Sequence, residues 1–290
     1  MSKQYTAFLR KAFSRYLSRL NAGGIEPKLS YLPYDFEEQL DKYVLGMVGH
    51  MMIRDELREI TNILNHWHGH LLRWHAWNKV LPGYSQDEAW DLRREFLDSL
   101  SHHCLLSPAA ARDTLTFVAT NSIHQLRLAL DGSYKDFLDG DPTKPGKKPT
   151  HLTRAKKEKR LEEIMLPWSE GADLISAIRS VDDKAYRDST WDYRNRSSHA
   201  IGQRLALGHT QAVTRLVEQA TELKDQGDGT FQIEPVPDKM SVSYAVGGTP
   251  PLDMEESRKL NLAQYHEARA AYLIYRDLLF KLASGLPKPP

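Results

Sequence analysis

Long segments of this chain place apolar residues at every third or fourth position, and this spacing most limits the folds that the chain can adopt. Apolar residues spaced in this way lie along one side of an α-helix, and that side has to be buried against another element. The longest such segment covers residues 36–80 and ends at Pro82-Gly83. Ser85 and Glu88 then form a capping box, which marks the start of the next helix. The pattern predicts a mainly α-helical chain.

The remaining segments complete a predicted single domain, and its fold class is all-α, a helical bundle with an N-terminal helical extension and a small β-hairpin. We expect a helix to begin at Ser107-Pro108, because serine caps helices and proline suits the first helical position. Residues 192–226 also have helical spacing, whereas apolar and polar residues alternate over 229–246, as in a hairpin. The predicted parts of the domain 1–290 are a basic helix and loop (1–35), long helices (36–138), a flexible basic linker or insertion (139–155), motif-bearing helices (156–226), the hairpin (229–246) and a C-terminal helix (253–284).

Positive charge is concentrated in two segments, although the formal net charge of the chain is only +1. Residues 1–25 carry a charge of +5 and residues 144–160 a charge of +7, so the remainder sums to −11. Basic segments on an acidic body favour an anionic partner such as RNA, bound in a salt-sensitive way, although two solvated flanks are the alternative. The candidate RNA contacts in the second segment are Lys147, Lys148, Lys156 and Lys157.

The sequence also carries an expectation about location. No apolar run approaches the roughly 18 residues that span a bilayer, and the start of the chain lacks the features of a signal peptide. Cys104 is the only cysteine of the chain and cannot form an internal disulfide, which is typical of a reducing compartment. We expect a cytoplasmic protein with no membrane association.

The segment from Trp191 to Ala200 contains residue types suited to cleaving RNA without a metal ion. Histidine titrates near neutral pH and can take the proton of a 2′-hydroxyl or return one to the leaving group, a role open to His199. Arginine stays charged, and its planar fork matches two phosphate oxygens, a role open to Arg194. Asn195 is placed to cap a helix here and to orient the phosphate, and Arg194 outside that helix would share one phosphate with His199. Arg196 is a further candidate phosphate contact.

The run Arg194-Asn195-Arg196-Ser197-Ser198-His199 resembles the signature of the HEPN superfamily, an arginine and a histidine separated by four to six residues, often with asparagine directly after the arginine. The resemblance extends as a helical pattern over residues 86–226. It implies a helical bundle that dimerises so that two motifs face each other. It also implies metal-independent RNA cleavage, commonly in toxin or anti-phage defence roles. Ile201 stands where some HEPN toxins carry a tyrosine that their antitoxin modifies, so that form of control is not implied.

We therefore predict a homodimeric endoribonuclease with Arg194, Asn195 and His199 as catalytic residues. RNA is its substrate, an antitoxin or other regulatory protein is a candidate partner, and the reaction needs no metal and no cofactor. The first alternative is a helical module that binds RNA or a protein without cutting, since the superfamily includes such members. In that case Arg194 is a surface arginine and His199 caps a helix at one end of the bundle.

A second group of residues, His66, His68 and His70, with His75 further on, raises the question of a metal site. His66 and His70 are one helical turn apart, as zinc ligands on a helix are. The metalloprotease pattern needs glutamate directly after the first histidine, but Trp67 stands there, and the sequence brings no acidic third ligand close. We interpret these residues and His102-His103 as packing or interface histidines. A metal-dependent hydrolase built on His66 and His70 is the third hypothesis.

Overall fold

The computed structural model describes residues 3–288 and confirms the mainly α-helical fold class with one small β-hairpin. The chain forms two compact units. The first takes in the described residues up to Arg194 and from Met254 onward, and the second is Asn195–Asp253. The second unit is therefore an insertion between two parts of the first, where the sequence pattern predicts a single domain. Across residues 3–288, no helix has an apolar stretch sufficient to cross a membrane.

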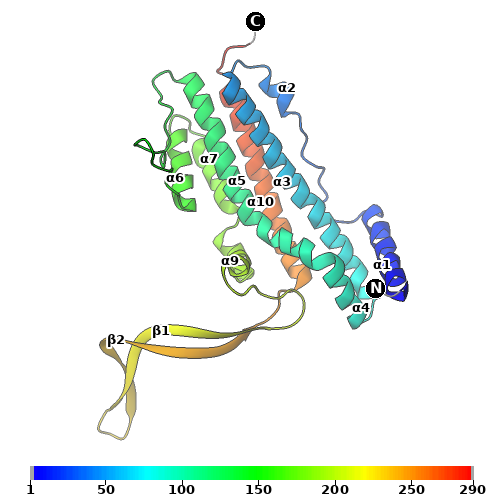
Figure 1. Ribbon diagram of the computed structural model, residues 1–290, viewed down its shortest axis with the longest axis vertical. Helices are drawn as coiled ribbons and strands as arrows, with labels where there is room; N and C mark the ends of the chain where they lie inside the picture. The colour runs from blue at the N-terminus through cyan, green and yellow to red at the C-terminus, as the bar shows by residue number, and fades with distance from the viewer. Residues whose placement is uncertain (1–2, 289–290) are drawn as a thin grey trace. The chain divides into compact units, whose positions relative to one another are not determined.

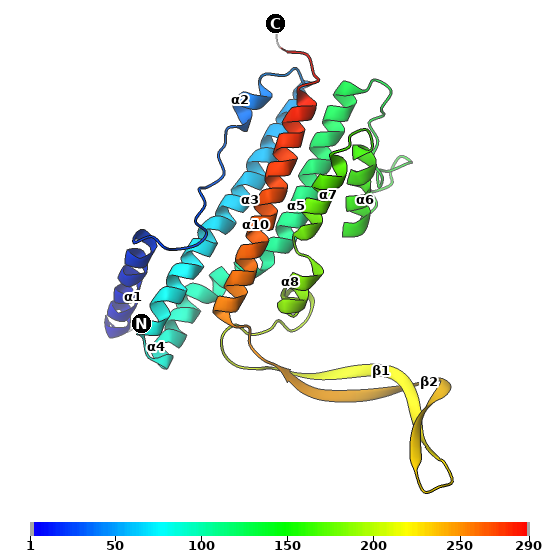
Figure 2. The same ribbon diagram turned by 180° about the vertical axis from the view of Figure 1, so that it is seen from behind.

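Three long helices form the centre of the first unit, namely α3 (Met47–Val80), α5 (Asp98–Leu130) and α10 (Met254–Ala283). They lie side by side along much of their length (Figures 1 and 2). Fully buried aromatic side chains fill the space between them, including Trp67 and Tyr265. Rings of this size remove a large apolar area from water, so this layer contributes strongly to the stability of the unit.

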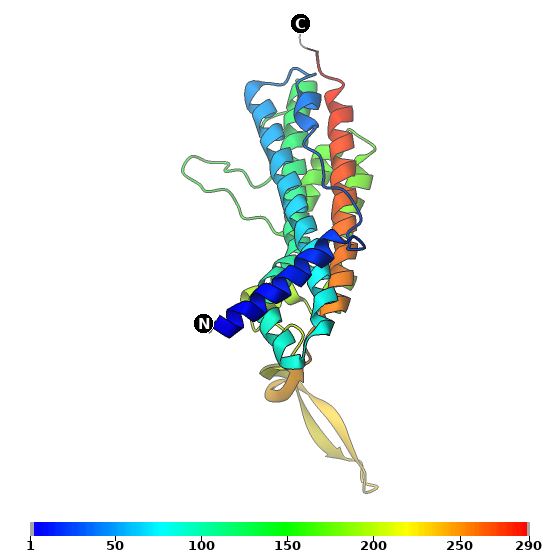
Figure 3. The ribbon, with the colours of Figure 1, turned by 90° about the vertical axis from the view of Figure 1, so that its right-hand side faces the viewer.

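Shorter helices cover this centre. α2 (Phe36–Leu40) packs on α3, α6 (Arg154–Met165) packs on α5, and α7 (Gly171–Ser180) packs on α10. α1 (Lys3–Asn21) lies obliquely across α3 (Figure 3). Tyr16 of α1 stacks on Trp77 of α3 with ring centroids 4.8 Å apart, and this contact ties the basic N-terminal helix to the unit.

The predicted capping box is confirmed, whereas the predicted helix start at Ser107-Pro108 is wrong. Ser85 caps α4 (Gln86–Leu92), which continues through a π-helical turn, η2 (Arg93–Leu97), into α5. α5 then runs through Pro108 without a break. Proline has no N–H, so the carbonyl of Cys104, four residues earlier, loses its usual donor. Asn261 Nδ2 on α10 donates to that carbonyl at 2.7 Å and replaces the missing bond.

The predicted helix over 192–226 is also wrong, because this helix, α9 (Tyr193–His199), ends at His199. The following segment holds Gly208 at a φ of 81°, in the left-handed region that glycine favours and an α-helix excludes. From there the chain enters a strand, β1 (Thr210–Asp225), that pairs antiparallel with β2 (Phe231–Thr249). The hairpin is thus longer than the predicted 229–246, and its first strand lies earlier in the chain.

Cross-strand pairing explains why the helical spacing in β1 misleads. Val213 lies opposite Val246, and Val217 lies opposite Val242. β-branched residues suit a strand, and pairs of them across two strands stabilise a hairpin. Those four side chains are all exposed, so no core selects a helix here. Gly227-Asp-Gly229, with both glycines at positive φ, forms the connection between the strands, as the sequence indicates.

Candidate functional site

The residues of the Arg194–His199 motif lie on α9, and the helix begins at an anchored tyrosine. The chain enters α9 through a turn in which Trp191 and Asp192 adopt φ values of 54° and 50°. Tyr193 is buried, and its hydroxyl forms a hydrogen bond of 2.8 Å with Nδ1 of His102 on α5. This contact holds the first residue of α9 in place, directly before Arg194.

Arg194 and His199 occupy different sides of the same helix. The expectation that Arg194 lies outside the helix is wrong, and so is the expectation that Asn195 caps it, because α9 already begins at Tyr193. Five helical positions correspond to a net rotation of about 140° and a rise of about 7.5 Å. One copy of α9 therefore cannot direct both side chains at the same phosphate. Asn195 and His199 are exposed, and Arg194 is half-buried.

Arg196, the fourth residue of interest on α9, is partly engaged within the second unit. Its Nη2 atom donates to Thr249 Oγ1, at the end of β2, over 3.4 Å, and the side chain is half-buried. A guanidinium has five N–H donors, so this long contact to Thr249 leaves donors for a phosphate. The structure is compatible with a secondary contact between Arg196 and a phosphate, because Arg196 lies on the same helix as Arg194 and His199.

Three of the four predicted lysine contacts lie together around a cavity in the first unit. The cavity has a volume of about 910 Å³ and lies between α6 and the loop 131–153, which has no helix or strand and extends away from the helices in Figure 3. Six cationic side chains line it against three acidic ones, so the cavity suits a phosphate-bearing ligand. The six are Lys144, Lys147, Lys148, Lys156, Lys159 and Arg160, and Lys157 is not among the residues that line it.

The loop beside this cavity is held by backbone contacts. Thr150 N donates to the carbonyl of Gly140 at 2.8 Å, which closes the loop on itself. Arg160 Nη1 on α6 donates to the carbonyl of Asp139 at 3.0 Å. These bonds place the loop lysines opposite the cations of α6, an arrangement that the charge count alone does not predict.

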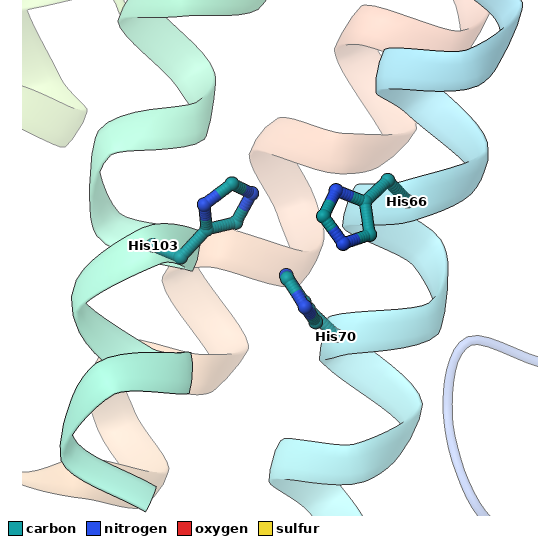
Figure 4. A group of neighbouring side chains, drawn as sticks. All are labelled: His66, His70 and His103. Atoms are coloured by element: carbon teal, nitrogen blue, oxygen red, sulfur yellow. The ribbon is translucent and has the colours of Figure 1, made fainter.

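The structure brings together three histidines that the sequence keeps apart. His66 and His70 lie on α3, and His103 comes from the facing helix α5 (Figure 4). Each offers a ring nitrogen, and these three atoms all lie within 4.8 Å of one another. The sequence interpretation gives His103 a packing or interface role, and only the pairing of α3 with α5 places it beside His66 and His70. His66 and His103 are exposed, whereas His70 is half-buried.

The electrostatic surroundings keep at least part of this cluster neutral at pH 7. Burial, aided by the neighbouring His103 and His66, lowers the pKa of His70 to about 4. Burial also lowers the pKa of His103, and His66 and His102 contribute to the shift. Nδ1 of His70 is buried and has no hydrogen-bond partner among the residues that the structure describes. A neutral imidazole with a free lone pair is the form that ligates metals.

Two other histidines of this region have packing roles, in agreement with the sequence interpretation. His68 is buried, stacks on Tyr31 with ring centroids 4.4 Å apart, and shares a hydrogen bond of 3.2 Å with the hydroxyl of Tyr265. His75 Nδ1 accepts a hydrogen bond of 2.9 Å from the backbone N–H of Glu26. Neither ring is available to the cluster formed by His66, His70 and His103.

Comparison with models of known protein families, with curated proteins and with solved structures finds no match for this chain. Three features of the described residues are candidates for a functional role, namely the motif on α9, the cationic cavity and the histidine cluster.

Proposed function

We propose that this protein is an endoribonuclease of the HEPN type that cuts RNA without a metal ion. The observation that carries the proposal is the motif Arg194-Asn195-x3-His199 on a short helix, with His199 and Asn195 exposed to a substrate. An imidazole, a guanidinium and an amide at this spacing supply a proton acceptor, a phosphate clamp and an orienting group.

The reaction follows from these groups. His199 takes the proton of a ribose 2′-hydroxyl, and the 2′-oxygen attacks the adjacent phosphorus while the bond from phosphorus to the 5′-oxygen breaks. Arg194 stabilises the negative charge that builds on the phosphate oxygens. A protonated imidazole returns a proton to the departing 5′-oxygen. The products carry a 2′,3′-cyclic phosphate and a 5′-hydroxyl.

The geometry of α9 favours a site shared by two copies of the chain. Within one copy, Arg194 and His199 are separated by about 140° around the helix. A second α9, related to the first by a two-fold axis, supplies an arginine to the side on which the first presents its histidine. We infer a homodimer, acting in the cytoplasm and held in check by an antitoxin or other regulatory protein, in a toxin or anti-phage defence role.

The cationic cavity supports an RNA substrate independently of the motif. Its lysines lie around one hollow of the first unit, and Lys147, Lys148 and Lys156 are among them. Backbone phosphates are bound by such cations without regard to base sequence, so the cavity provides affinity and the motif provides the chemistry.

The test is cleavage of a labelled RNA pool by the purified chain in the presence of EDTA. We expect cutting by the wild type, unchanged by the chelator, and products with a 2′,3′-cyclic phosphate. His199→Ala and Arg194→Ala should each lose at least about 100-fold in rate, the usual contribution of a general acid or base. His209→Ala is the matched control, because His209 is an exposed histidine of the same unit outside the motif.

Two results contradict the proposal. Full activity of His199→Ala, or loss of wild-type activity with EDTA, rules out the metal-free mechanism on α9. RNA binding without cleavage of any RNA in the pool favours the alternative, a helical binding module.

A further inference from the structure

The histidine cluster of α3 and α5 has the composition of a metal site. His66 and His70 are one helical turn apart and so share a face of α3, and His103 faces them from α5 (Figure 4). The ring centroids of His70 and His103 are 4.5 Å apart, and those of His66 and His70 are 4.1 Å apart. Three imidazoles from two helices thus converge on one point.

The spacing of the nitrogens comes close to what a tetrahedral zinc ion needs. Zinc binds histidine nitrogen at about 2.0–2.1 Å, so three ligands around one ion lie about 3–3.5 Å from each other. The three ring nitrogens here all lie within 4.8 Å of one another. Small rotations of the side chains close that difference without moving the helices.

A packing role accounts poorly for His70. Its Nδ1 atom is buried and lacks a hydrogen-bond partner among the described residues, a state that ordinarily costs about 1–3 kcal/mol. The rings of His66, His70 and His103 lie tilted or edge-on to one another, and such contacts do not recover that cost. A metal ion bound to His70 fixes the orientation of the ring, and it recovers that cost where Nδ1 is the ligand atom.

The charges around the cluster suit a cation with neutral ligands. His66 and His103 are exposed, so solvent reaches the cluster and can occupy the remaining coordination position. The charged group that influences His70 is Arg73, which is itself exposed, so water and salt weaken its repulsion of a cation. Imidazole ligands select zinc and its neighbours among the first-row transition metals rather than magnesium or calcium.

We propose that His66, His70 and His103 bind one zinc ion, with water in the fourth position, and that the ion links α3 to α5. This site lies on other elements than α9, and it is independent of the proposed RNA cleavage, which needs no metal. The main consequence is for the stability of the fold. An ion bound by two helices stabilises their pairing in the folded state and has no comparable site in the unfolded chain.

The sample is the full chain without a polyhistidine tag, freed of metal by EDTA and dialysis. The experiment is a titration of this sample with zinc chloride, followed by calorimetry. We expect one equivalent of zinc to bind and the melting temperature to rise with zinc concentration. His70→Gln and His103→Gln should weaken binding by more than the about 10- to 100-fold that is typical for loss of an outer-shell partner. The exposed His151 provides the matched control, and His151→Gln should bind zinc like the wild type.

A second measurement needs no variant and so does not depend on how the variants fold. Cobalt(II) bound by three imidazoles and water should give the visible bands of a four- or five-coordinate ion. Absence of zinc binding and of those bands overturns the proposal, and so does equal zinc affinity in His70→Gln and the wild type. RNA cleavage in EDTA is measured separately, so failure of one proposal leaves the other testable.

Discussion

Glu56 of α3 is a carboxyl group whose surroundings disfavour its charge. Asn121 Nδ2 donates to one of its oxygens, and Ser122 Oγ donates to the other over 3.4 Å. Ser122 in turn accepts a hydrogen bond of 2.8 Å from the hydroxyl of the buried Tyr275. These bonds favour the carboxylate, but the opposing effect of burial is larger and raises the pKa of Glu56 to about 7.

This shift predicts a pH dependence of stability that Glu56→Gln should remove. Between the ordinary pKa of 4.5 and the folded value of about 7, the folded chain holds a proton that the unfolded chain has lost. The contribution of Glu56 to the free energy of unfolding is therefore fully present below pH 4.5. It is lost as the pH rises through 7, at no more than about 1.4 kcal/mol per pH unit. Urea unfolding at several pH values measures this change in the free energy of unfolding.

The comparison is between each variant and the wild type. Relative to Glu56→Gln, the wild type should lose stability from pH 4.5 to pH 7 and change little above that. Glu59→Gln, which removes an exposed carboxylate from the same helix, should keep the wild-type profile. Parallel profiles for the wild type and Glu56→Gln would show that Glu56 does not titrate in this range.

At the scale of the elements, one asparagine joins four helices. Asn261 of α10 accepts from Trp67 Nε1 of α3 at 2.8 Å and donates to the carbonyl of Cys104 in α5 at 2.7 Å. It also bonds the hydroxyl of Tyr186, on α8 (Lys184–Ser189), at 3.0 Å. The bond to Cys104 takes the place of the one that Pro108 cannot make, so α10 compensates for the proline within α5.

Asn261→Ala should therefore destabilise the protein by about 2–4 kcal/mol, because buried donors and a carbonyl lose their partner together. In a Pro108→Ala background, the N–H of Ala at position 108 can donate to the carbonyl of Cys104. Asn261→Ala should then lower the free energy of unfolding by a smaller amount. The measurement is a double-mutant cycle by chemical denaturation. We expect a coupling energy between Asn261→Ala and Pro108→Ala of about 0.5 kcal/mol or more. Equal costs in both backgrounds would count against the link between Asn261 and Pro108.

At the scale of the whole molecule, the proposed shared site makes a prediction about mixtures. Each site is inferred to take its arginine from one copy and its histidine from the other. Arg194→Ala and His199→Ala are then both inactive alone, yet a dimer containing one of each retains one complete site. Co-refolded in equal amounts, half of the dimers are mixed, so about a quarter of wild-type activity should return.

Light scattering on each variant alone provides the control, because both should remain dimeric. A cleavage rate in the mixture no higher than in the separate variants would mean that Arg194 and His199 act from the same chain. A strictly monomeric wild type that cleaves RNA would exclude the shared site altogether.

Features encoded by neighbouring residues were predictable from the sequence. The spacing of apolar residues over 36–80 predicts a long helix, which the structure divides into α2 and α3 around the non-helical residues 41–46. Ser85 with Glu88 predicts the start of α4, and the glycines at 227 and 229 predict a chain reversal. The residues of the proposed RNA-cleavage motif can also be identified in the sequence, because the hypothesis rests on their chemical types and spacing. Each of these signals lies within a few residues of the structure that it specifies.

Other features depended on residues far apart in the chain. β1 is a strand because β2 pairs with it, although its own spacing favours a helix. α5 continues past Pro108 because Asn261, more than a hundred residues later, supplies a donor. His103 joins His66 and His70 because α5 packs against α3. The sequence by itself determined the mainly helical class, α3, the start of α4 and the chemical groups of this protein, since these are set by local residue types. Tertiary structure alone decided which of those groups meet, because contacts between distant segments form only when the elements pack.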